Sequence, residues 1–305
     1  MRFPRLDEAT RSARLAPPDG RVRLVLDTDA YNEIDDQFAL TYAMLSADRL
    51  SLEAVSAAPF HNARSSGPAD GMEKSRAEIL RVLERVGGPA PPVLRGSRSW
   101  LADESTAVES EAAREIVSRA RAGDAPLYVA AIGAITNVAS ALLMDPSITE
   151  RMVVVWLGGH ALHWPRTDEF NLKQDVRAAR VVFSSGVPLV HVPCAGVASH
   201  LLTTAPEMRA HVSGRGAVGD YLFKIFEEVC GTKPGASRVI WDIAAVAWLL
   251  EPEWVPTEIV PSPVVTDELT WDAAVAEGRH LIRSATLVRR DAVFGDFFAK
   301  LAHAR

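Results

Sequence analysis

The sequence predicts a single α/β domain with a mostly parallel central sheet and helices on both faces. Short apolar runs that suit buried strands alternate along the chain with longer segments of helical periodicity. No linker, internal repeat or shift in composition divides the 305 residues. We therefore expect an N-terminal extension at 1–21 and one domain at 22–305, with its site at the carboxyl ends of the strands.

The expected strands of the first half are apolar runs that end in polar or glycine-bearing turns. They cover 22–26, 52–57, 90–94, 127–132 and 152–157. Helices are expected between them: one that begins after an acidic loop and includes 38–40, then 72–86, 109–122 and 138–144. The stretch 59–71 is polar and carries Gly and Pro, which predicts a long loop.

The second half continues the alternation and then closes the sheet. A helix is expected at 176–185, where Gly186 would end it, followed by a strand at 187–192. Further helices are expected at 207–230, with breaks at glycines, and at 242–250. A strand pair at 259–266 and 280–289 and an amphipathic helix at 291–304 complete the prediction.

Composition narrows the class of protein. The chain is 48% hydrophobic and 24% charged, which is ordinary for a globular protein, and its net charge of −6 comes without a long basic run. We therefore expect neither nucleic acid nor an anionic membrane as a partner. The opening twenty residues lack an apolar block, no apolar run reaches about 18 residues, and the two cysteines suit reduced thiols. These features predict a cytoplasmic protein.

Carboxylates accumulate where the first strand ends. Between apolar runs at 22–26 and 38–40 stand four of them: Asp27, Asp29, Asp35 and Asp36. Four such groups beside a buried strand repel one another, and a hard divalent cation would neutralise them. The alternative is a solvated acidic turn in which Asp35 or Asp36 caps the next helix.

Other strand ends also carry polar residues. His61 and Asn62 follow the second strand, Thr136 and Asn137 follow the strand at 127–132, and Asp242 stands at the head of an apolar helix. Taken alone, Asp242 and the Thr136–Asn137 pair read as ordinary helix starts.

Six motifs stand in a recognisable order. DTD with DD at 27–36 is followed by GAITN (133–137), WLGG (156–159), EFNLKQD (169–175), VVFSSGVPL (181–189) and WDIAAVAWLLEP (241–252). This order resembles the nucleoside hydrolases, the inosine-uridine-preferring ribohydrolase family, from residue 22 to about residue 300.

The resemblance implies a calcium-dependent hydrolysis of the N-glycosidic bond of a ribonucleoside. Calcium would be held by Asp29, Asp36, the main-chain carbonyl of Thr136 and Asp242, all oxygen ligands. The ion would also bind the ribose 2′- and 3′-hydroxyls and a water, from which Asp29 would take a proton as general base.

The resemblance also implies which residues would bind the ribose. Asp35 would accept a hydrogen bond from the 2′-hydroxyl with Asn62 beside it, Glu169 and Asn171 would hold the 5′- and 3′-hydroxyls, and Asp27 would brace the loop. The resemblance further implies a homodimer or homotetramer that acts in purine or pyrimidine salvage.

The chain departs from the family at three places. Five residues separate Asp29 from Asp35 where three are usual, and we expect the additional Asn32 and Glu33 to face solvent. The histidine that many members carry before the late aspartate is Trp241 here, which cannot act as a general acid and would either stack on a nucleobase or pack in the core.

The third departure concerns the 5′ end of the substrate. Where an asparagine usually precedes the EFN motif, this chain has His163 and Trp164. His163 is a candidate for contacting the 5′ end or for protonating the leaving base, and His160 is a second candidate.

Two other readings remain open. A phosphatase of the haloacid dehalogenase type would use Asp27 as nucleophile, Asp29 as acid and Mg²⁺, although its lysine and late acidic pair have no clear counterpart here. A non-catalytic relative that binds ribose and calcium without turnover is the other, and the presence of Asp29 argues against it.

Overall fold

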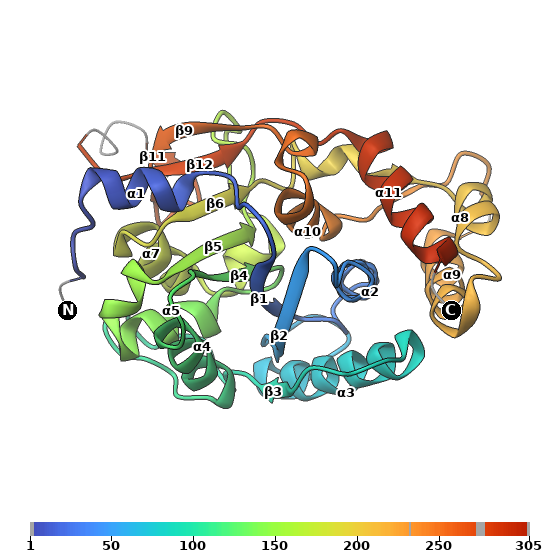
Figure 1. Cartoon of the computed structure of the whole chain (residues 1–305), viewed down its shortest axis with the longest axis horizontal. Coiled ribbons are helices and arrows are strands. Elements are labelled where there is room, and N and C mark those ends of the chain that lie inside the picture. The colour runs from blue at the N-terminus through green and yellow to red at the C-terminus, as the bar shows by residue number, and fades with distance from the viewer. Residues whose placement is uncertain (1–2, 232, 273–277, 304–305) are drawn as a thin grey trace.

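An eight-stranded sheet forms the centre of the computed structural model, which describes residues 3–231, 233–272 and 278–303 (Figure 1). The strand order is β3-β2-β1-β4-β5-β6-β12-β9, and every neighbouring pair is parallel except β12 and β9. The strands are β1 (Val22–Thr28), β2 (Leu50–Ala57), β3 (Val93–Arg95), β4 (Leu127–Ala131), β5 (Met152–Leu157), β6 (Leu189–Val192), β9 (Thr257–Pro261) and β12 (Leu281–Ala285). The predicted fold class is therefore confirmed.

Both faces of the sheet are buried, which explains the continuous apolar runs of the strands. Along β1, Leu24 and Leu26 point into one core and Val25 into the other, as the alternation of a strand requires. The first core lies under α2 (Asp36–Met44), α3 (Pro68–Val86), α10 (Ile243–Leu250) and α11 (Arg290–His303). The second lies under α4 (Glu111–Arg121), α5 (Thr136–Met144) and α7 (Val176–Ser185).

The N-terminal segment contains a helix that the sequence analysis did not expect. Helix α1 (Glu8–Leu15) begins after Asp7, whose carboxylate accepts a hydrogen bond from the backbone amide of Thr10. Arg11 donates to the carbonyls of Gly186, at 3.0 Å, and Leu281, at 3.3 Å. The segment before residue 22 is thereby attached to the ends of α7 and β12. The predicted extension begins at residue 1 and the predicted domain ends at residue 305, and residues 1, 2, 304 and 305 lie outside the described residues.

The smaller elements refine the predicted boundaries. Helix α3 starts at Pro68, inside the stretch expected to be a loop, and the expected helix at 207–230 is two helices, α8 (Ala205–His211) and α9 (Gly216–Cys230). The remaining elements are α6 (Phe170–Gln174), the strand pairs β7 (Leu202–Thr203) with β8 (Arg238–Val239) and β10 (Val264–Val265) with β11 (Trp271–Asp272), and 3₁₀ turns at Pro146–Glu150, Ala198–His200 and Pro252–Trp254. Within the described ranges, no helix has the length and apolar character needed to span a bilayer.

The strand order reverses between β1 and β4. From β1 the chain moves outward through β2 to β3, and it then returns to β4 and continues through β5 to β6 on the other side. In sheets of this kind the connections after the carboxyl ends diverge at the reversal and leave a crevice. The acidic segment that follows β1 lies at this point.

Candidate active site

A cavity of about 360 Å³ opens at the carboxyl ends of β1, β4, β5 and β6, a size suited to a small molecule. Its walls come from the segments that follow these strands and from the head of α10. The lining residues are Asp29, Asn32, Glu33, Asp35, Asp36, Asn62, Ile132, Leu157, His160, Asp168, Glu169, Phe170, Asn171, Cys194, Trp241 and Asp242.

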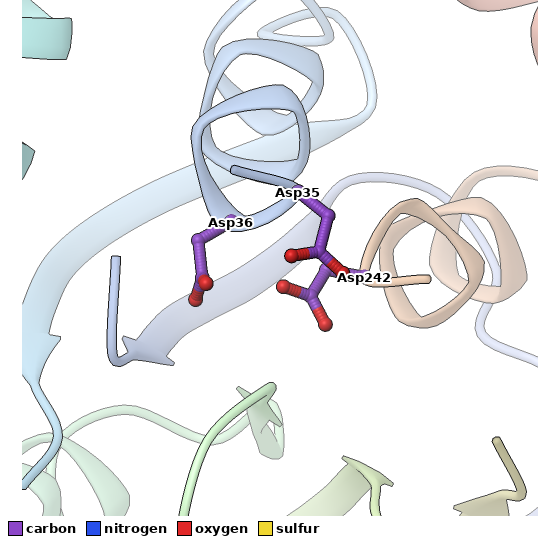
Figure 2. A group of neighbouring side chains, drawn as sticks. All are labelled: Asp35, Asp36 and Asp242. Atoms are coloured by element: carbon purple, nitrogen blue, oxygen red, sulfur yellow. The ribbon is translucent and has the colours of Figure 1, made fainter. Parts of the chain in front are cut away.

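Two helix N-termini bring three carboxylates together in this cavity. Asp35 and Asp36 stand at the start of α2 and Asp242 at the start of α10, and one oxygen of each lies within 4.8 Å of the others (Figure 2). All three residues are buried. Asp35 and Asp242 occupy N-cap positions, yet neither side chain makes a capping hydrogen bond. The reading of these residues as ordinary helix caps is therefore wrong.

Asp29 completes the acidic site from the end of β1. Both of its carboxylate oxygens are buried without a hydrogen-bond partner in the described part of the chain. The end of β4 comes so close that a Cβ on Gly133 would lie 2.9 Å from the carboxylate carbon of Asp29. An unpartnered buried carboxylate is costly unless a proton or a cation neutralises it.

The electrostatics of the four groups agree with a cation site. Burial, and then the carboxylates of Asp36 and Asp35, raise the pKa of Asp29 well above its usual range. Burial and like charges raise the pKa of Asp35 and Asp242 in the same direction. Burial raises the pKa of Asp36 to about 7, although a hydrogen bond from Thr28 opposes the shift. The donor set consists of oxygens only, which fits a hard divalent cation.

The structure does not bring Thr136 to this site. Thr136 is the first residue of α5, it is fully buried, and its hydroxyl donates to Asp175 at 2.8 Å. Its carbonyl lies in the first turn of a helix, where carbonyls serve the helix itself. From the end of β4, Ile132 lines the cavity instead. The expected role of Thr136 as a metal ligand is therefore corrected.

The two additional loop residues face the cavity, which corrects the expectation that they face solvent. Asn32 and Glu33 both line it. Asn62 donates to the side-chain carbonyl of Asn32 at 2.7 Å, and Glu33 forms an ion pair with Arg238. These partners lie in distant segments and hold the longer loop over the acidic group.

Glu169 and Asn171 both line the cavity and are fixed by backbone groups. The carboxylate of Glu169 accepts hydrogen bonds from the amides of Gly159, Asn171 and Leu172 at 2.8 to 3.0 Å. The side-chain nitrogen of Asn171 donates to the carbonyls of Ile132 and Leu157, both at 3.0 Å. The ends of β4 and β5 are thereby joined at the cavity wall.

Asp27 does not line the cavity and is held beneath it. Its carboxylate accepts a hydrogen bond from Asn137 at 2.8 Å, while the side-chain carbonyl of Asn137 accepts from the amide and hydroxyl of Ser97. Burial raises the pKa of Asp27 to about 7. These hydrogen bonds join β1, α5 and the segment after β3 beneath the cavity.

Only some of the aromatic side chains expected near the substrate line the cavity. His163 is exposed and does not line the cavity, so its expected contact with substrate is corrected, whereas His160 does line it. The backbone amide of Ala195 donates to Nδ1 of His160 at 3.2 Å. Trp241 is half-buried, lines the cavity and also packs on the edge of the first core.

Cys194 is a lining residue that the sequence analysis treated only as a packed thiol. It follows β6, and burial together with the nearby Glu169 raises the pKa of its thiol well above the usual range. Its position two residues after a predicted strand was the signal that could have placed it at the cavity.

Comparisons with known proteins agree with this geometry. A family model described as inosine-uridine preferring nucleoside hydrolase matches residues 24–294. The pyrimidine-specific ribonucleoside hydrolase RihA of Enterobacter sp. (strain 638) is 28% identical over 268 residues, which cover 77% of this chain and 80% of that protein.

Solved structures show the same fold at lower identity. A plant nucleoside hydrolase matches with a TM-score of 0.77 at 17% identity and covers 94% of this chain and 100% of its own. A purine-preferring ribonucleoside hydrolase from Gardnerella vaginalis matches with a TM-score of 0.72 at 20% identity, over 92% and 98% of the two chains.

Proposed function

This chain belongs to the inosine-uridine preferring nucleoside hydrolase family, and we propose that it hydrolyses the N-glycosidic bond of a ribonucleoside with calcium as its cofactor. The family places it among hydrolases that act on N-glycosyl compounds. The observation that carries the cofactor proposal is the buried, unpartnered carboxylate of Asp29 beside the cluster of Asp35, Asp36 and Asp242.

Asp29, Asp36 and Asp242 would hold the ion, while Asp35 lies close enough to face either the ion or the ribose 2′-hydroxyl. A bound divalent cation lowers the pKa of a coordinated water and holds hydroxyl oxygens. Asp29, whose carboxylate oxygens make no hydrogen bond in the described part of the chain, would take the proton of the attacking water as general base.

The other carboxylates stabilise the ribose as its bond to the base breaks. The transition state of glycoside cleavage gathers positive charge on the sugar, and fixed carboxylates in a water-poor cavity oppose that charge. Glu169 and Asn171 would orient the 5′- and 3′-hydroxyls from positions fixed by backbone hydrogen bonds. Asn62, held by Asn32, would assist at the 2′ side.

The two alternative readings are less well supported. The phosphatase reading needs Asp27 as a nucleophile with access to substrate. Asp27 is fully buried, accepts a hydrogen bond from Asn137 and does not line the cavity. A binding-only protein would use Asp29 as a metal ligand and not as a base, and release of ribose distinguishes the two readings. We also propose that the protein is a cytoplasmic homodimer or homotetramer that acts in nucleoside salvage. Light scattering on the purified protein would test its oligomeric state.

The test is release of ribose from inosine, adenosine, guanosine, uridine, cytidine and p-nitrophenyl riboside with added Ca²⁺. We expect turnover of at least one of these compounds, its loss with excess EGTA, and its recovery on addition of Ca²⁺. Asp29→Ala should abolish turnover, and Asp103→Asn, at an exposed position that does not line the cavity, serves as the matched control. Turnover that survives both EGTA and Asp29→Ala would refute the proposal.

A further inference from the structure

One buried hydrogen bond joins the two halves of the acidic site. Asp29 follows β1 and precedes Ala30, whereas Asp36 begins α2 and precedes Gln37. The side-chain nitrogen of Gln37 donates to the carbonyl of Ala30 at 2.7 Å. The residue after one expected metal ligand is therefore tied directly to the residue after another.

The side-chain amide of Gln37 lies between the two ends of the longer loop at 30–34. Its nitrogen is 2.7 Å from the carbonyl oxygen of Ala30 and 3.5 Å from that of Glu33. Both Gln37 and Ala30 are buried, and a buried carbonyl needs a donor. Among the described residues no other donor reaches the carbonyl of Ala30, so Gln37 alone satisfies it.

Glu78 orients this amide from helix α3. One of its carboxylate oxygens accepts from the nitrogen of Gln37 at 3.3 Å and from the hydroxyl of Tyr221 on α9, and the other accepts from Arg81. Glu78 is 1% exposed, and the proposed mechanism does not use it. Its partners hold the carboxylate in place, and the carboxylate keeps the nitrogen of Gln37, not its oxygen, turned toward the loop.

The oxygen of the same amide is buried without a hydrogen-bond partner in the described part of the chain. A buried, unpaired oxygen destabilises the folded state, and a methionine of nearly the same length would bury no such group. Packing therefore does not explain a glutamine at this position. The hydrogen bonds of its nitrogen to the loop and to Glu78 do explain it.

Building on the proposed function, we propose that Gln37 and Glu78 are positioning residues for the calcium site. Gln37 fixes the carboxylate of Asp29 relative to that of Asp36, and Glu78 fixes Gln37. A longer loop has more conformations to lose when a cation binds. The buried amide restricts the loop before the ion arrives, so the ion meets ligands that are already in place.

The test is Ca²⁺ binding to the purified protein by titration calorimetry, after treatment with EGTA and dialysis. Gln37→Met keeps the length of the side chain and removes its donor. We expect this variant to raise the Kd for Ca²⁺ by about 10-fold or more, as is typical when a group that orients a ligand is lost. Binding should weaken without being abolished, because Thr28 still donates to Asp36.

Two variants of Glu78 test the same contact from α3. Glu78→Gln keeps an oxygen that accepts from Gln37, so it should bind Ca²⁺ about as tightly as the wild type. Glu78→Met removes both acceptors and should raise the Kd by about 5-fold, which corresponds to one hydrogen bond. Recovery of affinity in Glu78→Gln relative to Glu78→Met is the result that a purely structural role would not give.

Tyr42→Phe is the matched control. Tyr42 is fully buried near the other end of α2, and its hydroxyl donates to Asp296 at 2.6 Å. Loss of this hydrogen bond should lower the urea midpoint of unfolding. The Kd for Ca²⁺ should change by no more than about 2-fold, because distant sites act independently.

The outcomes separate this inference from the proposed function. If the wild type binds no Ca²⁺, the cofactor proposal fails and this inference fails with it. If the wild type binds Ca²⁺ and a folded Gln37→Met protein binds it equally well, the inference is overturned and the cofactor proposal stands. An equal loss of affinity in Tyr42→Phe would also overturn it, since general destabilisation would then be the cause. If circular dichroism shows that Gln37→Met is unfolded, equal Kd values for the two Glu78 variants overturn the inference.

Discussion

The acidic site should make the stability of the folded protein depend on pH and on calcium. Without metal, the contribution of the site falls as pH rises, whereas bound calcium stabilises the folded state. Burial raises the pKa of Asp36 from 3.8 to about 7 in the folded protein. The folded state therefore binds this proton more tightly than the unfolded state, so the contribution of this group to metal-free stability falls as pH rises from about 4 to about 7. A shift of about 3 units corresponds to about 4 kcal/mol for this group.

Replacing Asp36 by Asn removes that group from the cluster and isolates its contribution. At pH 7.5 in EGTA, Asp36→Asn should be more stable than the wild type by up to about 4 kcal/mol, because a carboxylate whose charge is disfavoured by burial, and then by Glu33, is gone. At pH 5 the advantage should shrink to about half. The measurement is urea unfolding followed by fluorescence at both pH values, with Asp124→Asn, at an exposed position, as the control.

Calcium should narrow the difference in stability between the two proteins. At about 100 times its dissociation constant, Ca²⁺ would add about 2.7 kcal/mol to the wild type and much less to Asp36→Asn. Because the ligands must lose their protons, binding at pH 6 should release protons, which an indicator dye detects. Equal calcium stabilisation of the two proteins, or wild-type stability in EGTA that exceeds that of Asp36→Asn, would refute this account of the site.

Three further predictions concern single residues. Asp29→Asn should lower kcat by about 10² to 10⁴-fold in the ribose assay while Asp103→Asn does not, and a smaller loss would remove Asp29 as the base. Asn137→Ala leaves Asp27 and Ser97 without their mutual bridge and should cost about 3 kcal/mol in urea unfolding, whereas a cost below about 1 kcal/mol would show that the bridge is dispensable. Burial lowers the pKa of His191 from 6.5 to about 4, so its protonation favours the unfolded state and its contribution to stability should be lost as pH falls from about 6.5 to about 4. His191→Gln should flatten this part of the profile, and an unchanged slope would contradict the assignment.

The order of strands and helices was predictable because it depends on local pattern. Apolar runs such as Met152–Leu157 stand between polar turns, and their length and composition suit buried parallel strands. The helix Val176–Ser185 was predicted with its observed bounds because it has an apolar period before it and Gly186 after it, and Gly186 adopts a left-handed φ of 81°. Helix α1 was missed because only Leu15 of its residues is buried, so its sequence carries little apolar signal.

The candidate site was predictable in its main carboxylates and less so in its other residues. Asp29, Asp35 and Asp36 follow a strand, and strand ends meet at the crevice of such a sheet. Choosing His163 over His160 failed because both stand in one loop and only its path decides which ring reaches the cavity. Thr136 failed because it is the first residue of α5, whose carbonyls serve the helix, and Ile132 lines the cavity from the end of β4 instead.

The sequence by itself determined the α/β fold, the family and the acidic group after β1, since each rests on residue types at short spacing. Only the tertiary structure decided which loop side chains face the cavity. Glu33 turns inward because Arg238 meets it there, 205 positions away, and Asn32 because Asn62 reaches it from the end of β2. Such pairings arise when distant segments pack together, and no local pattern of residues specifies them.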